Sequence, residues 1–282
     1  MYCVYKTILL CQKEHNIMSE NVLKRNNVKV VGKGVQPMLF IHGFGCDQNI
    51  WRFVTPAFEE RYKIILLDLV GCGKSDDSAY DPEKYDTLQG HVNDVLEICT
   101  VLELKNIILV GHSISANISL LSCISNNEIF EKLILVCPSP KFLNEDGYTG
   151  GFDQKDIDGL IDAIESNYLG WSKAIAPVIM SNVERPELSN ELEESFCSNN
   201  PEIAVHFAKV TFLCDNRSDL EKVKTKSLVL QSKTDNLAAV SVGEYVHKKI
   251  KNSTFKILET NGHCPHLSHP KETILAIDEF LA

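Results

Sequence analysis

The segment from Ile107 to Ala116 restricts the fold of this chain more than any other part of its sequence. Its first four residues are apolar and mostly β-branched, which predicts a strand buried on both faces. Gly111 ends the apolar run, and a helix is predicted over 117–125. A serine at such a strand-to-helix turn is typical of a nucleophile elbow, in which the hydroxyl is held above the sheet. Ser113 is therefore the candidate nucleophile.

The elbow departs from its usual pattern, Gly-x-Ser-x-Gly, at one position. Ser115 stands in place of the second glycine. Glycine is favoured there because the turn packs closely against neighbouring backbone, and serine adds only a small side chain. The motif alone has many chance matches, so the rest of the chain has to support it.

The composition is that of a globular protein and argues against several partners. The 282 residues carry a net charge of −10, whereas nucleic acids and anionic membranes require clustered lysine and arginine. The apolar runs are too short to span a bilayer. Ten cysteines are spread over predicted strands and helices, which favours reduced thiols and a cytoplasmic location. Residues 1–17 are predicted to be a disordered leader ahead of a more polar start at Met18.

Apolar strands alternate with helical patterns along most of the chain. This alternation predicts an α/β fold, with a mostly parallel central sheet and helices on both faces. Between about 154 and 213 only helical patterns occur, so this stretch is predicted to be an inserted four-helix cap. The predicted core comprises 18–140 and 217–282, and the cap comprises 141–216. The predicted strands are 27–31, 38–41, 62–67, 107–110, 133–136, 227–230 and 254–258, and the predicted helices are 51–58, 87–102, 117–125, 155–167, 169–180, 186–198, 201–213, 241–250 and 270–281.

Two further catalytic candidates follow predicted strands. Asp235 comes after the strand at 227–230, and His263 comes after the strand at 254–258. Open parallel sheets bind ligands beyond the carboxyl ends of their strands, so these side chains are expected near Ser113. The chain order Ser, Asp, His is that of an α/β-hydrolase. The histidine would take the serine proton, and the aspartate would orient the imidazole and stabilise its charged form.

A tetrahedral intermediate needs N–H donors for its oxyanion. One donor is predicted at Ile114, directly after the nucleophile. The second is predicted at Phe44, because Gly43 and Gly45 on either side of it allow a close approach of backbone to a ligand.

Aromatic residues are frequent in the predicted cap. Most are expected to pack helices together, but some must face the cleft that the cap covers. The predicted substrate is therefore a small, mostly apolar acyl compound such as an ester or lactone. The pocket candidates are Phe142, Phe152, Trp171, Phe196 and Phe207.

Five motifs are specific to one family, namely Gly43–Gln48, Asp68–Asp76, Gly111–Ala116, Asn167–Trp171 and Gly262–Pro270. Together they resemble the RsbQ-type α/β-hydrolases, which are similar in turn to the plant strigolactone and karrikin receptor hydrolases. The resemblance runs from about Val22 to the C-terminus and includes cap and loop motifs. It implies a Ser-His-Asp hydrolase with a four-helix cap over a closed apolar pocket, and its triad falls on the three residues chosen above.

For RsbQ the resemblance also implies a regulatory task in a bacterial general stress response, exercised together with a sensor phosphatase. Two functions therefore stay open at this point. The first is a serine hydrolase that cleaves its substrate through an acyl-enzyme. The second is a ligand-binding signalling protein whose cap engages a protein partner such as that phosphatase, with hydrolysis secondary.

Several rival assignments are weaker. His266 is the alternative base, and Asp215 and Asp219 are alternative acids, with a helix cap preferred for Asp219. The thiols of Cys46, Cys72 and Cys264 lie near the predicted site, but none is on an elbow. Gly71–Ser75 resembles the end of a phosphate-binding loop but has Asp68 where the first glycine belongs. His263, His266 and His269 could ligate zinc, but no second ligand cluster accompanies them, so neither a metal nor another cofactor is predicted.

Overall fold

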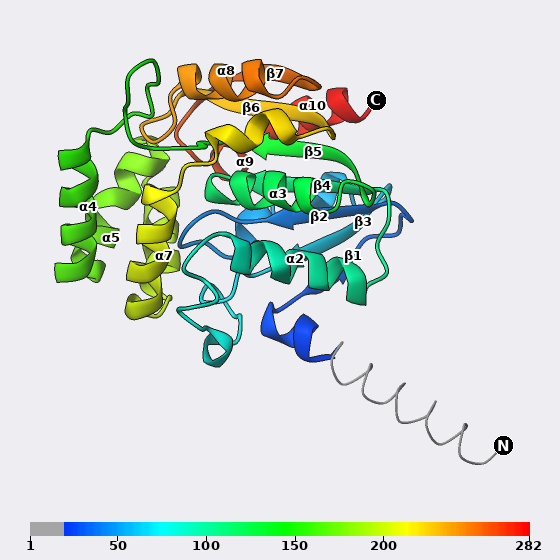
Figure 1. Ribbon diagram of the computed structural model, residues 1–282, viewed down its shortest axis with the longest axis horizontal. Coiled ribbons are helices and arrows are strands. Elements are labelled where there is room, and N and C mark those ends of the chain that lie inside the picture. Colours follow the sequence, from blue (N-terminus) through cyan, green and yellow to red (C-terminus); the bar gives the residue numbers. More distant parts are fainter. Residues whose placement is uncertain (1–19) are drawn as a thin grey trace, which may run out of the picture.

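The computed structural model describes residues 20–282, and a seven-stranded sheet forms its centre (Figure 1). The strand order is β1-β3-β2-β4-β5-β6-β7. β1 pairs antiparallel with β3, and the other neighbours are parallel, which confirms the predicted fold class. The strands are β1 (Lys29–Val31), β2 (Pro37–Ile41), β3 (Lys63–Leu67), β4 (Ile107–His112), β5 (Phe130–Val136), β6 (Lys226–Thr234) and β7 (Ser253–Asn261).

Both faces of the sheet are covered because the central strands are apolar on both sides. Along β2, Met38 and Phe40 belong to one core cluster, and Leu39 and Ile41 belong to the other. The second cluster lies under α2 (Gln89–Val101), α3 (Ile114–Ser125) and α8 (Val240–Lys249). The first lies under α10 (Pro270–Leu281) and also extends to the inserted helices. The sheet is thus fixed as the rigid support for the residues at its strand ends.

Four helices lie between β5 and β6 and pack together beyond one end of the sheet (Figure 1). Each agrees with its predicted segment to within one residue at either end. They are α4 (Gln154–Ser166), α5 (Tyr168–Met180), α6 (Pro186–Cys197) and α7 (Pro201–Leu213). The division of the chain into core and cap at 141 and 216 stays a prediction.

The predicted helix at 51–58 is wrong. The segment instead holds parts of two 3₁₀ turns, η1 (Gln48–Trp51) and η2 (Thr55–Ala57). Pro56 lacks an N–H and cannot donate to the carbonyl four residues earlier. The N–H groups of Val54, Ala57 and Phe58 therefore reach carbonyls three residues back. Such bonds close 3₁₀ turns.

Smaller differences occur at other boundaries. α3 begins at Ile114, directly after the candidate nucleophile, and not at Asn117. β6 and β7 continue to Thr234 and Asn261, and the short helix α9 (Pro265–Ser268) was not predicted. The predicted leader at 1–17 lies outside the described residues. Among the helices that are described, none combines the length and the apolar character needed to cross a membrane.

Candidate active site

Ser113 occupies the sharp turn between β4 and α3. Its φ is +57°, in a region that residues other than glycine rarely adopt. Its N–H donates to the carbonyl of Val136 on the neighbouring strand, at 2.9 Å, which fixes the turn to the sheet. A Cβ at Gly111 would lie 2.3 Å from the carbonyl oxygen of Ser115. Glycine is therefore required at 111, because the helix starts directly above the strand.

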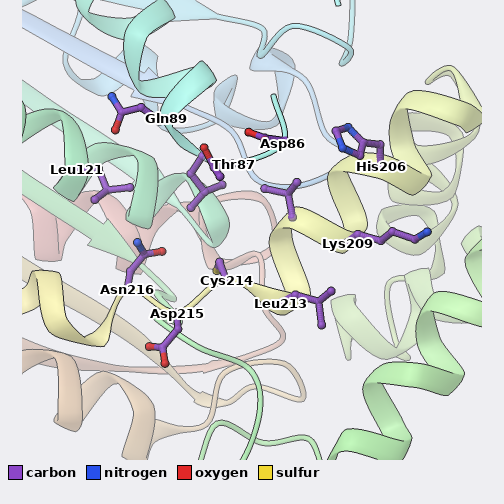
Figure 2. Close-up of a pocket in the computed structure, with 12 residues that line it drawn as sticks. Asp86, Thr87, Gln89, Leu121, His206, Lys209, Leu213, Cys214, Asp215 and Asn216 are labelled. Carbon is purple, nitrogen blue, oxygen red and sulfur yellow. The ribbon is translucent and has the colours of Figure 1, made fainter. Parts of the chain in front are cut away.

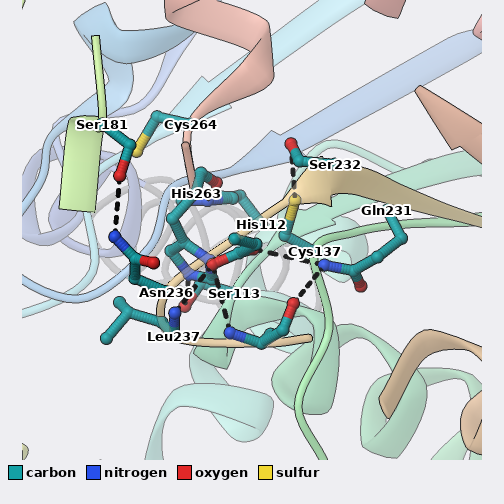
Figure 3. A network of polar contacts seen from close by, with 12 residues as sticks. His112, Ser113, Cys137, Ser181, Gln231, Ser232, Asn236, Leu237, His263 and Cys264 are labelled. Atoms are coloured by element: carbon teal, nitrogen blue, oxygen red, sulfur yellow. Dashed lines mark hydrogen bonds and ion pairs between the residues drawn. The ribbon is translucent and has the colours of Figure 1, made fainter. Parts of the chain in front are cut away.

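The structure brings Ser113, His263 and Asp235 together. Figure 3 labels Ser113 and His263 within their network of polar contacts. The distance from His263 Nε2 to Ser113 Oγ is 2.8 Å. The distance from His263 Nδ1 to Asp235 Oδ2 is also 2.8 Å. If Nδ1–H donates to the carboxylate, Nε2 is left as the acceptor for the serine proton. All three groups come from the carboxyl ends of parallel strands, as the sequence predicts.

The carboxylate of Asp235 is held by four hydrogen bonds. Oδ1 accepts from the N–H groups of Leu237 and Ala238, at 2.8 and 3.1 Å. Oδ2 accepts from His263 and, at 3.2 Å, from Nε2 of Gln231. Burial alone would raise the pKa of this carboxyl group, but the attraction of His263 and the hydrogen bonds outweigh it, and the pKa is lowered. Asp235 is thereby kept as an anion beside the imidazole.

Gln231 was missed by the sequence analysis. It lies in β6, its side chain is fully buried, and Nε2 donates both to Asp235 and, at 2.6 Å, to the carbonyl of Ala238. This bridge fixes the loop that carries the carboxylate. The signal that could have revealed it is a polar residue that directly follows the apolar run Leu228–Leu230 of a buried strand.

The two predicted oxyanion donors lie at the entrance of α3 and in the loop after β2. Ile114 is the first residue of α3, so its N–H has no partner inside the helix. In the part of the chain that the structure describes, neither this N–H nor that of Phe44 donates to another protein group. Both donors are therefore free to bind an oxyanion. The structure explains the departure at Ser115, whose hydroxyl donates to the carbonyl of His42 in the loop that carries Phe44.

Ser115→Ala should destabilise the protein by about 1–3 kcal/mol, because it leaves the buried carbonyl of His42 without this donor. It should also lower the kcat of ester hydrolysis, since the loop that carries Phe44 is no longer tied to the elbow. Urea denaturation and ester hydrolysis measure the two effects. Ser122→Ala is the matched control, because that buried hydroxyl donates only to the carbonyl of Ile118 in its own helix. Equal loss of kcat in both variants would contradict the role given to Ser115.

A small, partly enclosed cavity of about 60 Å³ is lined by Ser113 and His263. Four of the predicted pocket residues line it, namely Phe142, Phe152, Trp171 and Phe196. The fifth, Phe207, does not. Its ring packs between Phe44 and His91, with centroids 5.5 and 4.9 Å away, in the core cluster under α2. Lining residues that were not predicted include Phe44, Leu160, Ile175, Ile179, Leu192, Thr211, Phe212 and Leu237.

His266, the alternative base, is fully buried beneath the site. Its ring lies between those of Trp51 and His112, with centroids 4.3 and 4.4 Å away. Within residues 20–282, neither ring nitrogen has a hydrogen-bond partner. Burial, followed by repulsion from His112 and His263, lowers its pKa well below the usual value. His266 therefore packs the support of the site and does not contact Ser113 as His263 does.

The alternative acids are engaged elsewhere. Asp215 pairs with Lys141 at 3.1 Å and with Arg217 at 2.6 Å. The hydrogen bond from Arg217, the largest effect, lowers its pKa to about 2. Asp219 lies inside the turn η4 (Arg217–Lys222), whose N-cap is Asn216. The predicted capping role of Asp219 is wrong, because its carboxylate accepts from the side chains of Asn216 and Lys222 instead of from a backbone N–H at the start of the turn.

The cysteines near the site are held as thiols. Cys46 and Cys264 line the cavity, and burial raises the pKa of each well above its usual value. Burial also raises the pKa of Cys72 to about 12. A thiol is a poor nucleophile compared with its thiolate, so these residues are not activated.

The zinc alternative does not correspond to a cluster of ligands. Among the described residues, the one group of three close metal-ligating side chains is Cys137, Asp235 and His263, which excludes His266 and His269. Within it, Asp235 and His263 are hydrogen-bonded to each other.

A second and larger hollow, of about 590 Å³, opens between α2, α3 and α7 (Figure 2). Its lining includes His206, Lys209 and Asp215, and none of the three triad candidates.

Comparison with known proteins agrees with this geometry. The model of the alpha/beta hydrolase family matches residues 38–276. The chain belongs to this family. Among the relatives of this hydrolase is a strigolactone esterase of Pisum sativum, 37% identical over 255 residues, which are 90% of this chain and 95% of the relative. A karrikin insensitive 2 receptor of Petunia hybrida is 34% identical over 254 residues, with 90% and 94% covered. A hydrolase from Oleispira antarctica has a solved structure with a TM-score of 0.91 and 38% identity, with 93% and 97% covered.

Proposed function

We propose that this hydrolase cleaves a small, mostly apolar ester or lactone through an acyl-enzyme formed on Ser113. The observation that carries the proposal is the continuous hydrogen-bonded chain from Ser113 through His263 to Asp235, which begins in the floor of an apolar cavity. The family and its esterase relatives support hydrolysis of an ester-type bond. A cytoplasmic location remains part of the proposal, on the cysteine pattern of the sequence.

The reaction follows from the positions of the proton donors and acceptors. Nε2 of His263 takes the proton of Ser113 as Oγ attacks the carbonyl carbon, and Asp235 stabilises the imidazolium. The N–H groups of Phe44 and Ile114 stabilise the negative oxygen of the tetrahedral intermediate. His263 then gives its proton to the leaving oxygen, and the acyl group stays on Ser113. Water, deprotonated by the same imidazole, releases the acid and restores the hydroxyl.

The size of the cavity predicts a preference for short acyl chains. Pockets for drug-sized ligands hold roughly 300–1,000 Å³, whereas this one holds about 60 Å³. A long acyl chain must push the packed aromatic walls apart, which costs about 1–3 kcal/mol of binding free energy. We expect kcat/KM for p-nitrophenyl acetate to exceed that for the octanoate by about 10- to 100-fold. Leu160→Ala, which enlarges the cavity, should reduce this ratio, and an unchanged or inverted ratio would contradict the size argument.

Covalent labelling tests the proposed function directly. A fluorophosphonate should add once to the folded protein, and peptide mapping should place the adduct on Ser113. His263→Ala should suppress the labelling, because the hydroxyl then has no base. Labelling at another residue, or undiminished labelling of His263→Ala, would overturn the proposal.

A signalling role is the second candidate, and the named relatives favour it, because one of them is called a receptor. In this version ligand entry or hydrolysis shifts α4–α7, and the altered surface engages a protein partner such as a sensor phosphatase, as in the bacterial stress response of RsbQ. A purified sensor phosphatase encoded beside the gene should bind the wild type more tightly with substrate than without. Equal binding in both conditions, or none, would leave hydrolysis as the function.

A further inference from the structure

Among the described residues, two polar side-chain atoms on the α5 and α7 side of the catalytic cavity have no hydrogen-bond partner. Thr211, on α7, and Trp171, on α5, both line the cavity, and their side chains are buried, with 1% and 8% of each residue exposed. Within the described residues, neither Thr211 Oγ1 nor Trp171 Nε1 makes a hydrogen bond. The rest of the lining from α4–α7 is apolar. These two atoms are therefore the polar features that the helical side of the cavity offers to a ligand.

Within the described residues, two buried hydroxyls inside helices lack a hydrogen-bond partner, those of Thr211 and of Ser119 in α3, and of the two only Thr211 lines the cavity. A serine or threonine inside a helix commonly donates to the carbonyl four residues earlier. Thr100, Ser122 and Ser172 do so in this chain, each at 2.8 Å. Thr211 makes no such bond, so its hydroxyl stays available to the cavity. A buried polar group without a partner costs stability, and such groups in native proteins commonly mark a functional requirement or a bound molecule.

We propose that the hydroxyl of Thr211 donates a hydrogen bond to a second oxygen atom of the substrate, separate from the carbonyl that Ser113 attacks. The preferred substrates are then short esters or lactones whose acyl part carries an ether, keto or hydroxyl oxygen. The inference rests on the proposed function, since it concerns the same cavity. Such an oxygen can accept from the hydroxyl of Thr211, and the indole N–H of Trp171 can only donate. A site built to hydrogen-bond an oxygen rejects the analogue that lacks it, because its polar groups are then left unpaired.

Matched pairs of esters test the inference. p-Nitrophenyl methoxyacetate and butyrate differ by one oxygen in place of a methylene, as do the 3-methoxypropionate and the valerate. For each pair we measure the ratio of kcat/KM, oxygen over methylene, in the wild type and in Thr211→Val, Thr211→Ala and Thr211→Ser. The oxygen esters are chemically more reactive, and this raises the ratio by the same factor in every variant. Comparing the ratio of each variant with that of the wild type therefore cancels the difference in reactivity.

In at least one pair, Thr211→Val and Thr211→Ala should lower the ratio by about 5- to 10-fold, the usual worth of one hydrogen bond. Thr211→Ser should restore it. Ser172→Ala is the matched control, because that buried hydroxyl of α5 is bonded to Tyr168 and does not line the cavity, so it should leave both ratios unchanged.

Two outcomes separate this inference from the proposed function. If the wild type hydrolyses the esters, with ratios that are the same in all Thr211 variants, the inference is overturned and the hydroxyl serves only a buried water. If the wild type hydrolyses none of the esters and Ser113 is not labelled, the proposed function fails, and the inference fails with it. Ratios that change equally in Thr211→Val and Ser172→Ala would also overturn the inference, because they indicate a general effect of packing.

Discussion

Ser113→Ala should lower the kcat of ester hydrolysis by at least about 10⁴-fold while the protein stays folded. The hydroxyl is the nucleophile of the proposed acyl-enzyme, and its hydrogen bond to His263 is the path by which it loses its proton. Alanine can adopt the same backbone no less easily than serine, so the elbow and the cavity remain. Hydrolysis of p-nitrophenyl acetate measures kcat, and a urea denaturation curve shows whether the variant is folded. A residual rate within tenfold of the wild type would remove Ser113 from the chemistry.

Asp235→Asn provides the control that separates a triad from a lone nucleophile. An amide at 235 favours the wrong tautomer of His263, and we expect a loss in kcat of about 10⁴-fold. Residues that act as one unit have non-additive effects. The double variant, which combines Ser113→Ala and Asp235→Asn, should therefore hydrolyse the ester no more slowly than Ser113→Ala alone. A further loss in the double variant would show that Asp235 acts through a route that does not include the serine.

The places of the three triad candidates at strand ends could be predicted because strand ends are visible in the sequence. Each of β4, β6 and β7 is followed, within two residues of its end, by one of the three side chains that the chemistry requires, and parallel strands bring those ends to one edge. The four inserted helices were visible for a similar reason, since each has a helical apolar pattern and a polar N-terminal boundary.

Other features depend on packing that periodicity does not encode. Phe207 lies on the same helix as Thr211 and Phe212, but its ring points to His91 instead of into the cavity. Which aromatic residues face the ligand depends on how α7 is rotated against the sheet. The bonds from Gln231 to Asp235 and from Ser115 to His42 likewise join elements whose relative placement is known only in three dimensions.

Stability should fall steeply as the pH drops below about 6.5, because three buried histidines are neutral in the folded protein. Burial lowers the pKa of His91 and of His112 to about 3, and it lowers that of His266 well below its usual value. In the unfolded chain each imidazole has a pKa near 6.5. Between pH 6.5 and about 3 the unfolded state therefore binds up to three more protons than the folded state, and protonation favours unfolding.

The expected slope near pH 5 is about 4 kcal/mol per pH unit, which is three times the value for one proton. Integrated from pH 7 to pH 5, the free energy of unfolding should decrease by about 6 kcal/mol, a large part of the 5–15 kcal/mol typical of a folded domain. Urea denaturation at intervals of half a pH unit measures it. Below pH 5, Asp235 adds to the loss, because its stabilisation disappears as the pH falls through its lowered pKa.

His91→Phe isolates the contribution of one histidine away from the catalytic residues. The imidazole packs against the rings of Tyr85 and Phe207, and within the described residues neither of its nitrogens has a partner, so a phenyl ring removes no hydrogen bond. The variant should reduce the slope by one proton, about 1.4 kcal/mol per pH unit. A slope equal to that of the wild type would mean that His91 titrates alike in both states. The large acid sensitivity would then have to arise from His112 and His266, which lie beneath the site, and acid unfolding would begin where Ser113 and His263 are held.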